Sequence, residues 1–128
     1  MKLTQSLRSR YEKVLSFITS AEAEGATLVT GGSTRPSAAG SKGFFVQPTG
    51  FEVEPNHSLW KDEVFGPVLG VKTFRTEEEA VALANDSTYG LAASVFSADE
   101  DRVDRVASRL RAGKVRQKSM HDAGGSLF

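Results

Sequence analysis

The first part of the chain carries apolar residues at the spacing of an amphipathic helix. The stripe runs from residue 7 to residue 24 and includes Leu7, Tyr11, Val14, Leu15 and Ile18. These positions share one face of a helix with 3.6 residues per turn. We therefore predict a helix over residues 7–24, which Gly25 ends. A short strand is expected at residues 26–30, where Gly31 and Gly32 favour a simple turn rather than a nucleotide-binding loop.

The middle of the chain predicts short extended segments. Residues 44–53 are apolar, but Pro48 and Gly50 interrupt them. This interruption favours two short extended pieces over one central strand. We expect a turn or short helical bend at residues 55–61 and a strand at residues 68–74.

Two helices with capping signals follow in the second half. Thr76 and Glu79 have the spacing of a capping box, and so do Ser97 and Glu100. In each pair the hydroxyl and the carboxylate can bind free amides of the first helical turn. The second helix has the clearest apolar stripe of the chain, and we expect Gly113 to end it. That stripe consists of Val103, Val106, Ala107 and Leu110.

Strands are also expected at residues 91–96 and 114–117, so strands and capped helices alternate along the chain. Such alternation is typical of βαβ units. The predicted fold class is therefore α/β, with a mostly parallel sheet flanked by helices.

Composition limits the partners and the chemistry. The 128 residues suit one domain, and 16 basic residues balance 16 acidic ones. This balance argues against broad nucleic-acid or membrane binding, although it leaves a local basic patch open. We see no targeting segment and expect a cytoplasmic protein. Cysteine is absent, which excludes a disulfide and a thiolate nucleophile within these residues.

Most catalytic motifs are missing from the sequence. It has no G-x-G-x-x-G, Walker A or G-x-S-x-G pattern. His57 and His121 lack the spacing of metal ligands, so we expect both on the surface and no metal site. The informative segment runs from Trp60 to Val68. There Asp62 and Glu63 point opposite ways on an extended chain, so one of the two carboxylates could accept two sugar hydroxyls while Phe65 packs on a flat heterocycle. Local physics alone favours a solvated acidic turn with Phe65 in the core.

This segment is one of five motifs that occur in the order and at the spacing of a known protein family. The chain resembles the aldehyde dehydrogenase superfamily, and most closely its betaine-aldehyde and aminoaldehyde branch. The matching segments are Gly43-Phe44-Phe45-Val46-Gln47-Pro48-Thr49, Asp62-Glu63-Val64-Phe65-Gly66-Pro67-Val68, Glu79-Ala80 with Ala84-Asn85-Asp86, Tyr89-Gly90-Leu91-Ala92-Ala93-Ser94-Val95-Phe96, and Ala112-Gly113-Lys114-Val115.

The resemblance implies the later part of a catalytic domain that uses NAD(P) to oxidise aldehydes to acids. It implies that Glu63 hydrogen-bonds the nicotinamide ribose and that Phe65 lies beside the nicotinamide. Gly66 and Pro67 would shape the turn that presents them. We expect residues 1–115 to be a partial catalytic domain and residues 116–128 a divergent tail.

Departures from the family pattern limit the expected activity. The family's nucleophilic cysteine, its general-base glutamate and its dinucleotide-binding domain have no counterpart here, so we assign no catalytic residue. At the other end, Arg116 and Lys118 stand where the motif has an aromatic residue and an asparagine. We expect the chain alone to be inactive as a dehydrogenase, with cofactor binding doubtful.

Two other interpretations stay open. The chain could be a non-catalytic, regulatory or stress-related module that self-associates or pairs with a full-length relative. It could also be a relic of gene truncation without a selected activity.

Overall fold

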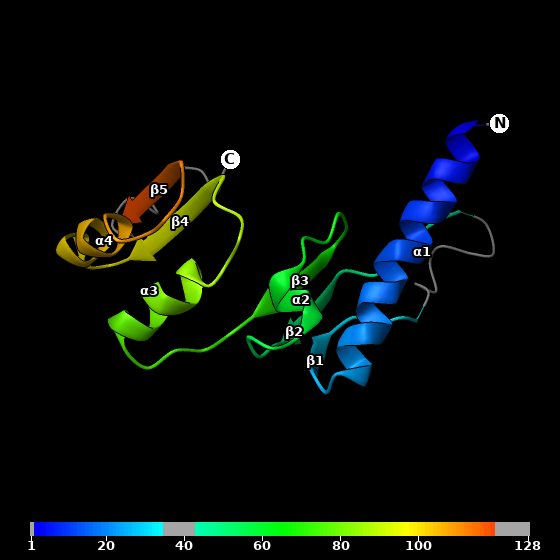
Figure 1. Cartoon of the computed structure of the whole chain (residues 1–128), viewed down its shortest axis with the longest axis horizontal. Coiled ribbons are helices and arrows are strands. Elements are labelled where there is room, and N and C mark those ends of the chain that lie inside the picture. Colours follow the sequence, from blue (N-terminus) through cyan, green and yellow to red (C-terminus); the bar gives the residue numbers. More distant parts are fainter. Residues whose placement is uncertain (1, 35–42, 120–128) are drawn as a thin grey trace. The chain divides into compact units, whose positions relative to one another are not determined.

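The computed structural model describes residues 2–34 and 43–119. The chain forms two compact units, Met1–Thr73 (unit 1) and Phe74–Phe128 (unit 2). Figure 1 labels the helices and strands of both units. Each unit has its own sheet and its own helices, and each is described by itself.

Unit 1 combines two helices with a three-stranded sheet. Its strands lie in the order β1-β2-β3. Strands β1 and β2 are antiparallel, whereas β2 and β3 are parallel. The elements are α1 (Lys2–Ala23), β1 (Thr27–Thr30), β2 (Thr49–Glu52), α2 (Ser58–Lys61) and β3 (Val68–Val71).

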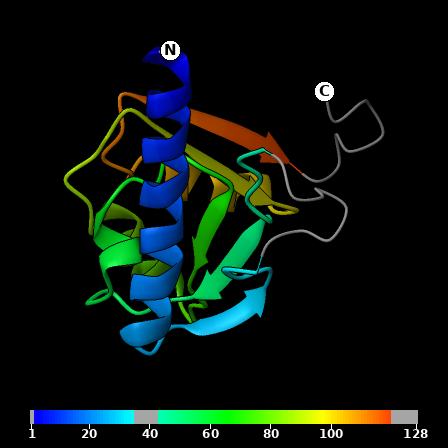
Figure 2. The ribbon, with the colours of Figure 1, turned by 90° about the vertical axis from the view of Figure 1, so that its right-hand side faces the viewer.

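The predicted apolar stripe of α1 packs against one face of this sheet. Ile18 and Ala21 of α1 are completely buried, and so are Phe51 and Val53. These four belong to a single core cluster that also includes Leu59 of α2. Figure 2 shows α1 lying across the strands of unit 1. The predicted helix is thus confirmed, and it begins five residues earlier than the stripe indicated.

The turn after β1 is fixed by two glycines. Gly31 and Gly32 have φ of 81° and 112°, which L side chains rarely adopt. A Cβ on Gly31 would collide with the carbonyl oxygen of Pro48. The Thr49 hydroxyl accepts from the Gly32 amide at 3.0 Å. The simple turn predicted here is therefore confirmed.

Unit 2 contains a two-stranded sheet and two helices. Strands β4 and β5 are parallel and in register from Ala92 opposite Lys114 to Ser97 opposite Ser119. Helix α4 contacts both strands. The elements are α3 (Glu77–Asn85), β4 (Ala92–Ser97), α4 (Glu100–Ala107) and β5 (Lys114–Ser119).

The predicted α/β class is confirmed, with a difference in how the strands assemble. They form two separate sheets, and two of the three described pairings are parallel. Of residues 44–53, only the second expected piece becomes a strand, β2. No helix among the described residues has the length and apolar character to cross a membrane.

One helix cap was predicted correctly and the other was not. The Thr76 hydroxyl accepts from the Glu79 amide at 3.1 Å, as expected. Ser97, however, is the last residue of β4, and the cap of α4 is Asp99, whose carboxylate accepts from the Arg102 amide at 3.0 Å. The prediction of a Ser97 cap was wrong because the strand extends one residue further than expected.

The predicted end of the last helix was also wrong. Helix α4 ends at Ala107, and Leu110 lies beyond it. Gly113 instead donates from its amide to the Gly90 carbonyl at 2.7 Å, which ties the start of β5 to the segment before β4.

His57 is buried, contrary to the prediction of a surface residue. Only 7% of it is exposed. Its Nδ1 accepts from the Glu54 amide at 3.1 Å, and its own amide donates to the Glu54 carbonyl at 3.0 Å. This reciprocal pairing closes the turn before α2 and supplies the polar partner that burial requires. His121 lies outside the described residues.

A carboxylate and three arginines join the two helices of unit 2. Glu77, in the first turn of α3, accepts two hydrogen bonds of 2.8 Å from the guanidinium of Arg105 on α4. Arg109 and Arg102 approach the same carboxylate at 3.7 and 3.8 Å. The hydrogen bond from Arg105 lowers the pKa of Glu77, and the positive charges of Arg105, Arg109 and Arg102 lower it further.

We expect Glu77→Gln to make unit 2 less stable at neutral pH and less sensitive to acid. A lowered carboxyl pKa contributes stability that is complete above the unfolded pKa, about 4.3, and is lost as pH falls through the folded pKa. Hydrogen exchange of the α4 amides at pH 7 and pH 3 measures this. Glu78→Gln is the matched control because the Glu78 side chain is 75% exposed and its carboxylate lies as far as 4.0 Å from the Arg109 guanidinium. An equal acid response in wild type and Glu77→Gln would contradict the assignment.

Candidate functional site

The candidate site is a turn between α2 and β3. Asp62 ends α2, and its amide donates to the Ser58 carbonyl at 2.9 Å. Further on, the Gly66 amide donates to the Val64 carbonyl and the Val68 amide to the Gly66 carbonyl, each at 2.9 Å. These short-range bonds reverse the chain just before β3 starts.

Gly66 brings this turn into direct contact with α1. A Cβ at this position would lie 2.6 Å from Cγ2 of Val14, which is too close for two carbon atoms. Val14 is itself buried, with 4% exposed. Only a residue without a side chain therefore lets the turn lie this close to the helix.

This packing decides which side chains of the turn face outward. Val64 packs against the core cluster of unit 1. Phe65 is 68% exposed instead. The prediction that Phe65 lies in the core was wrong, because the inward position of the turn is taken by Val64 and successive side chains of an extended segment alternate in direction.

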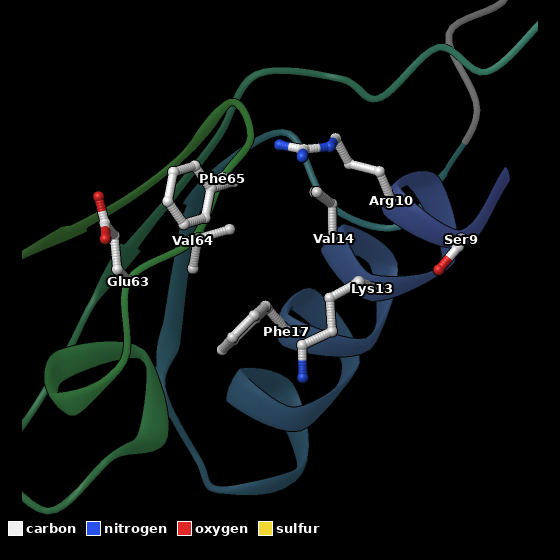
Figure 3. Close-up of a pocket in the computed structure, with 8 residues that line it drawn as sticks. All are labelled: Ser9, Arg10, Lys13, Val14, Phe17, Glu63, Val64 and Phe65. Carbon is white, nitrogen blue, oxygen red and sulfur yellow. The ribbon is translucent and has the colours of Figure 1, made fainter. Parts of the chain in front are cut away.

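Glu63 and Phe65 line one pocket together with a face of α1. The cavity has a volume of about 340 Å³. Figure 3 shows Glu63 and Phe65 on the turn opposite the helical side chains. The lining residues are Ser9, Arg10, Lys13, Val14, Phe17, Glu63, Val64 and Phe65. Of the two adjacent carboxylates, Glu63 lies in this pocket and Asp62 does not.

The helical wall of the pocket is cationic and aromatic. The Arg10 guanidinium lies 5.7 Å from the centre of the Phe65 ring. The Lys13 ammonium lies 4.9 Å from the centre of the Phe17 ring. Both distances are within the range of cation–π attraction. Each cation therefore lies close to a ring, while its side chain remains exposed.

Sequence reasoning missed this helical wall. It examined α1 only for its apolar stripe. Arg10, Lys13 and Phe17 are spaced at i, i+3 and i+7, so they also share a face of the helix. That spacing was the available signal, although nothing in the sequence indicated which segment would lie opposite it.

Glu63 keeps its hydrogen-bonding capacity. Within residues 2–34 and 43–119, its carboxylate has no hydrogen bond or ion pair. Two carboxylate oxygens offer acceptor sites for two neighbouring hydroxyls. With the exposed face of Phe65 beside it, the turn can contact a sugar diol and a planar ring at once.

Comparison with known proteins identifies the family. The sequence model described as "Aldehyde dehydrogenase family" matches residues 5–124. The chain belongs to this family. It is 54% identical to aminoaldehyde dehydrogenase 2 of Pisum sativum over 107 residues, which are 83% of this chain. It is 48% identical to the betaine aldehyde dehydrogenase of Atriplex hortensis over 109 residues, or 84% of this chain.

Solved aldehyde dehydrogenase structures have the same fold over this region. A mutant of aldehyde dehydrogenase C from Pseudomonas syringae, in complex with NAD+ and octanal, has a TM-score of 0.82 at 40% identity. The superposition covers 86% of this chain and 23% of the Pseudomonas syringae chain. The betaine aldehyde dehydrogenase of Staphylococcus aureus, in complex with NAD+, has a TM-score of 0.81 at 40% identity, over 87% of this chain and 22% of that one.

The match covers a minor part of each relative. The chain spans about a fifth of the length of the curated relatives, 21% in both cases above. The family resemblance of the five motifs is confirmed, and so is the resemblance to the aminoaldehyde and betaine-aldehyde branch. The family uses NAD(P), whereas the contact of Glu63 and Phe65 with that cofactor remains a prediction for this chain.

Proposed function

We propose that this chain is the part of an NAD(P)-dependent aldehyde dehydrogenase that contacts the nicotinamide end of the cofactor. One observation carries the proposal: Glu63 and Phe65 line a single pocket, with the carboxylate unpartnered among the described residues and the ring 68% exposed. In this assignment Glu63 accepts the ribose hydroxyls and Phe65 packs beside the nicotinamide. The cofactor, when bound, accepts a hydride.

The 128 residues taken alone do not catalyse aldehyde oxidation in this proposal. In the family the reaction begins with attack of a cysteine thiolate on the aldehyde, and these residues contain no cysteine. None of the side chains that line the pocket is a thiol. The residues described above position one end of the cofactor, and the nucleophile has to come from other parts of a dehydrogenase.

Cofactor titration by calorimetry tests this assignment. We expect NAD to bind weakly to the wild-type chain and Glu63→Ala to weaken binding tenfold or more, because a hydrogen bond to a charged group contributes about 1.5–3 kcal/mol. The matched control is Asp62→Ala, since Asp62 is the adjacent exposed carboxylate and lies outside the pocket.

Two results would contradict the proposal. The first is NAD binding that Glu63→Ala and Asp62→Ala leave equally unchanged. The second is sustained NADH production when betaine aldehyde or an aminoaldehyde is added to the purified 128-residue chain, because it would require a nucleophile that we do not find here.

A non-catalytic assembly role is a second candidate, and the sheet of unit 1 favours it. Helix α1 covers only one face of this sheet. On the other face of the edge strand β3, Leu69 and Val71 are 63% and 42% exposed. Within residues 2–34 and 43–119 the outer edge of β3 is unpaired, and an exposed apolar face next to such an edge is a typical surface for association. Its partner would be a second copy of the chain or a full-length relative.

We expect this surface to make the chain dimerise at high concentration, and Leu69→Lys to return it to a monomer. Burying a charge within an apolar interface is unfavourable unless the charge is paired. Light scattering coupled to size exclusion measures the mass. Leu91→Lys in unit 2 is the matched control because Leu91 is 90% exposed. A monomeric wild-type chain at every concentration would rule out self-association.

A further inference from the structure

Within residues 74–119, the sheet of unit 2 has one face that α4 covers and one open face. Alternate residues of a strand point to opposite faces. Val95 of β4 and Val115 of β5 are half-buried, and α4, with its buried Val103 and Ala107, contacts both strands. The residues that alternate with these half-buried positions along each strand point away from α4. These are Ala92, Ser94 and Phe96 on β4 and their register partners Lys114, Arg116 and Lys118 on β5.

The open face carries a row of three cations. Lys114, Arg116 and Lys118 occupy every second position of β5, which places them about 6.6 Å apart along the strand. Neither β4 nor β5 contains an acidic residue. Within residues 43–119, none of the three cations forms an ion pair.

Four other arginines of unit 2 are already engaged, which distinguishes this row from them. Arg102, Arg105 and Arg109 surround the Glu77 carboxylate. Arg111 donates to the Asn85 carbonyl at 2.6 Å. The positive charge of the β5 row is therefore not neutralised by residues 43–119, and an external anion can compensate it.

An exposed aromatic ring lies next to the row. Phe96 is 61% exposed and is the register partner of Lys118. A ring on an open sheet face offers a platform on which a base can stack, while cations beside it contact the backbone. Charge at regular intervals with an adjacent ring matches the chemistry of a single-stranded nucleic acid.

We propose that the open face of β4 and β5 binds single-stranded nucleic acid, with a base on Phe96 and phosphates on Lys114, Arg116 and Lys118. The overall charge balance of the chain argues only against a broad basic surface, and this row is local. Arg116 and Lys118 stand where the family motif has an aromatic residue and an asparagine. The site would therefore belong to this chain and not to the dehydrogenase reaction.

The alternative occupant is an acidic polypeptide, and Phe96 argues against it. Carboxylates would satisfy the three cations equally well, but they would leave the exposed ring without a stacking partner. A double helix is also less suitable, because its bases are already stacked and cannot reach the ring.

Fluorescence anisotropy with a labelled oligothymidylate tests the proposal on the full chain. Three phosphate contacts predict a slope of about −2 for the logarithm of the binding constant against the logarithm of salt concentration. Arg116→Gln should reduce the size of this slope by about 0.7. Arg8→Gln should leave it unchanged, since Arg8 is an exposed arginine of α1 in unit 1 and is not part of the β5 row.

Phe96→Ala separates base stacking from charge. It should weaken binding about fivefold or more with an unchanged salt slope, because loss of a stacked base costs about 1–3 kcal/mol. Circular dichroism shows whether each variant is folded. The proposal is overturned if oligothymidylate does not bind at low salt, if polyglutamate binds as tightly, or if folded Phe96→Ala binds as well as wild type.

Discussion

The contact between Val14 of α1 and the backbone of Gly66 is the constraint on which the candidate site depends. The core of unit 1 fixes the helix through Ile18 and Phe51, both completely buried. The fixed helix places Val14 where the turn can approach only without a side chain. Val64 then points inward, and the neighbouring Glu63 and Phe65 become available to a ligand.

The two walls of the pocket offer different chemical groups to a ligand. The turn offers a free carboxylate and an exposed ring, whereas the helix offers Arg10 and Lys13, each held over a ring. Such a surface can recognise and orient part of a cofactor. Attack on an aldehyde by a cysteine thiolate requires a residue type that the 128 residues do not contain. The residues of this pocket are suited to recognition and not to bond formation.

The sequence predicted most elements correctly because their signals are local. The stripe of α1, the turn at Gly31 and the Thr76 cap depend on residues within one or two turns of each other. The division into two sheets depends on pairings between distant segments, such as Thr49 with Val68, which no local pattern reports. Ser97 failed as a cap because strand pairing with Ser119 extended β4 through it.

The candidate site was predictable only in part, for a related reason. Motif matching found Glu63 and Phe65, but local hydrophobicity placed Phe65 in the core. Its exposure follows from the approach of Gly66 to a helix some 50 residues earlier in the chain. Arg10 and Lys13 were missed because the segment opposite them is equally distant.

A double-mutant cycle between positions 14 and 66 tests the dependence of the site on this contact most directly. Gly66→Ala should lower the free energy of unfolding by about 1–3 kcal/mol, as overpacking of a core does. It should also shift the Phe65 ring resonances. In the Val14→Ala background both effects should be clearly smaller, because the colliding methyl groups are gone. Equal costs in the two backgrounds would contradict the account.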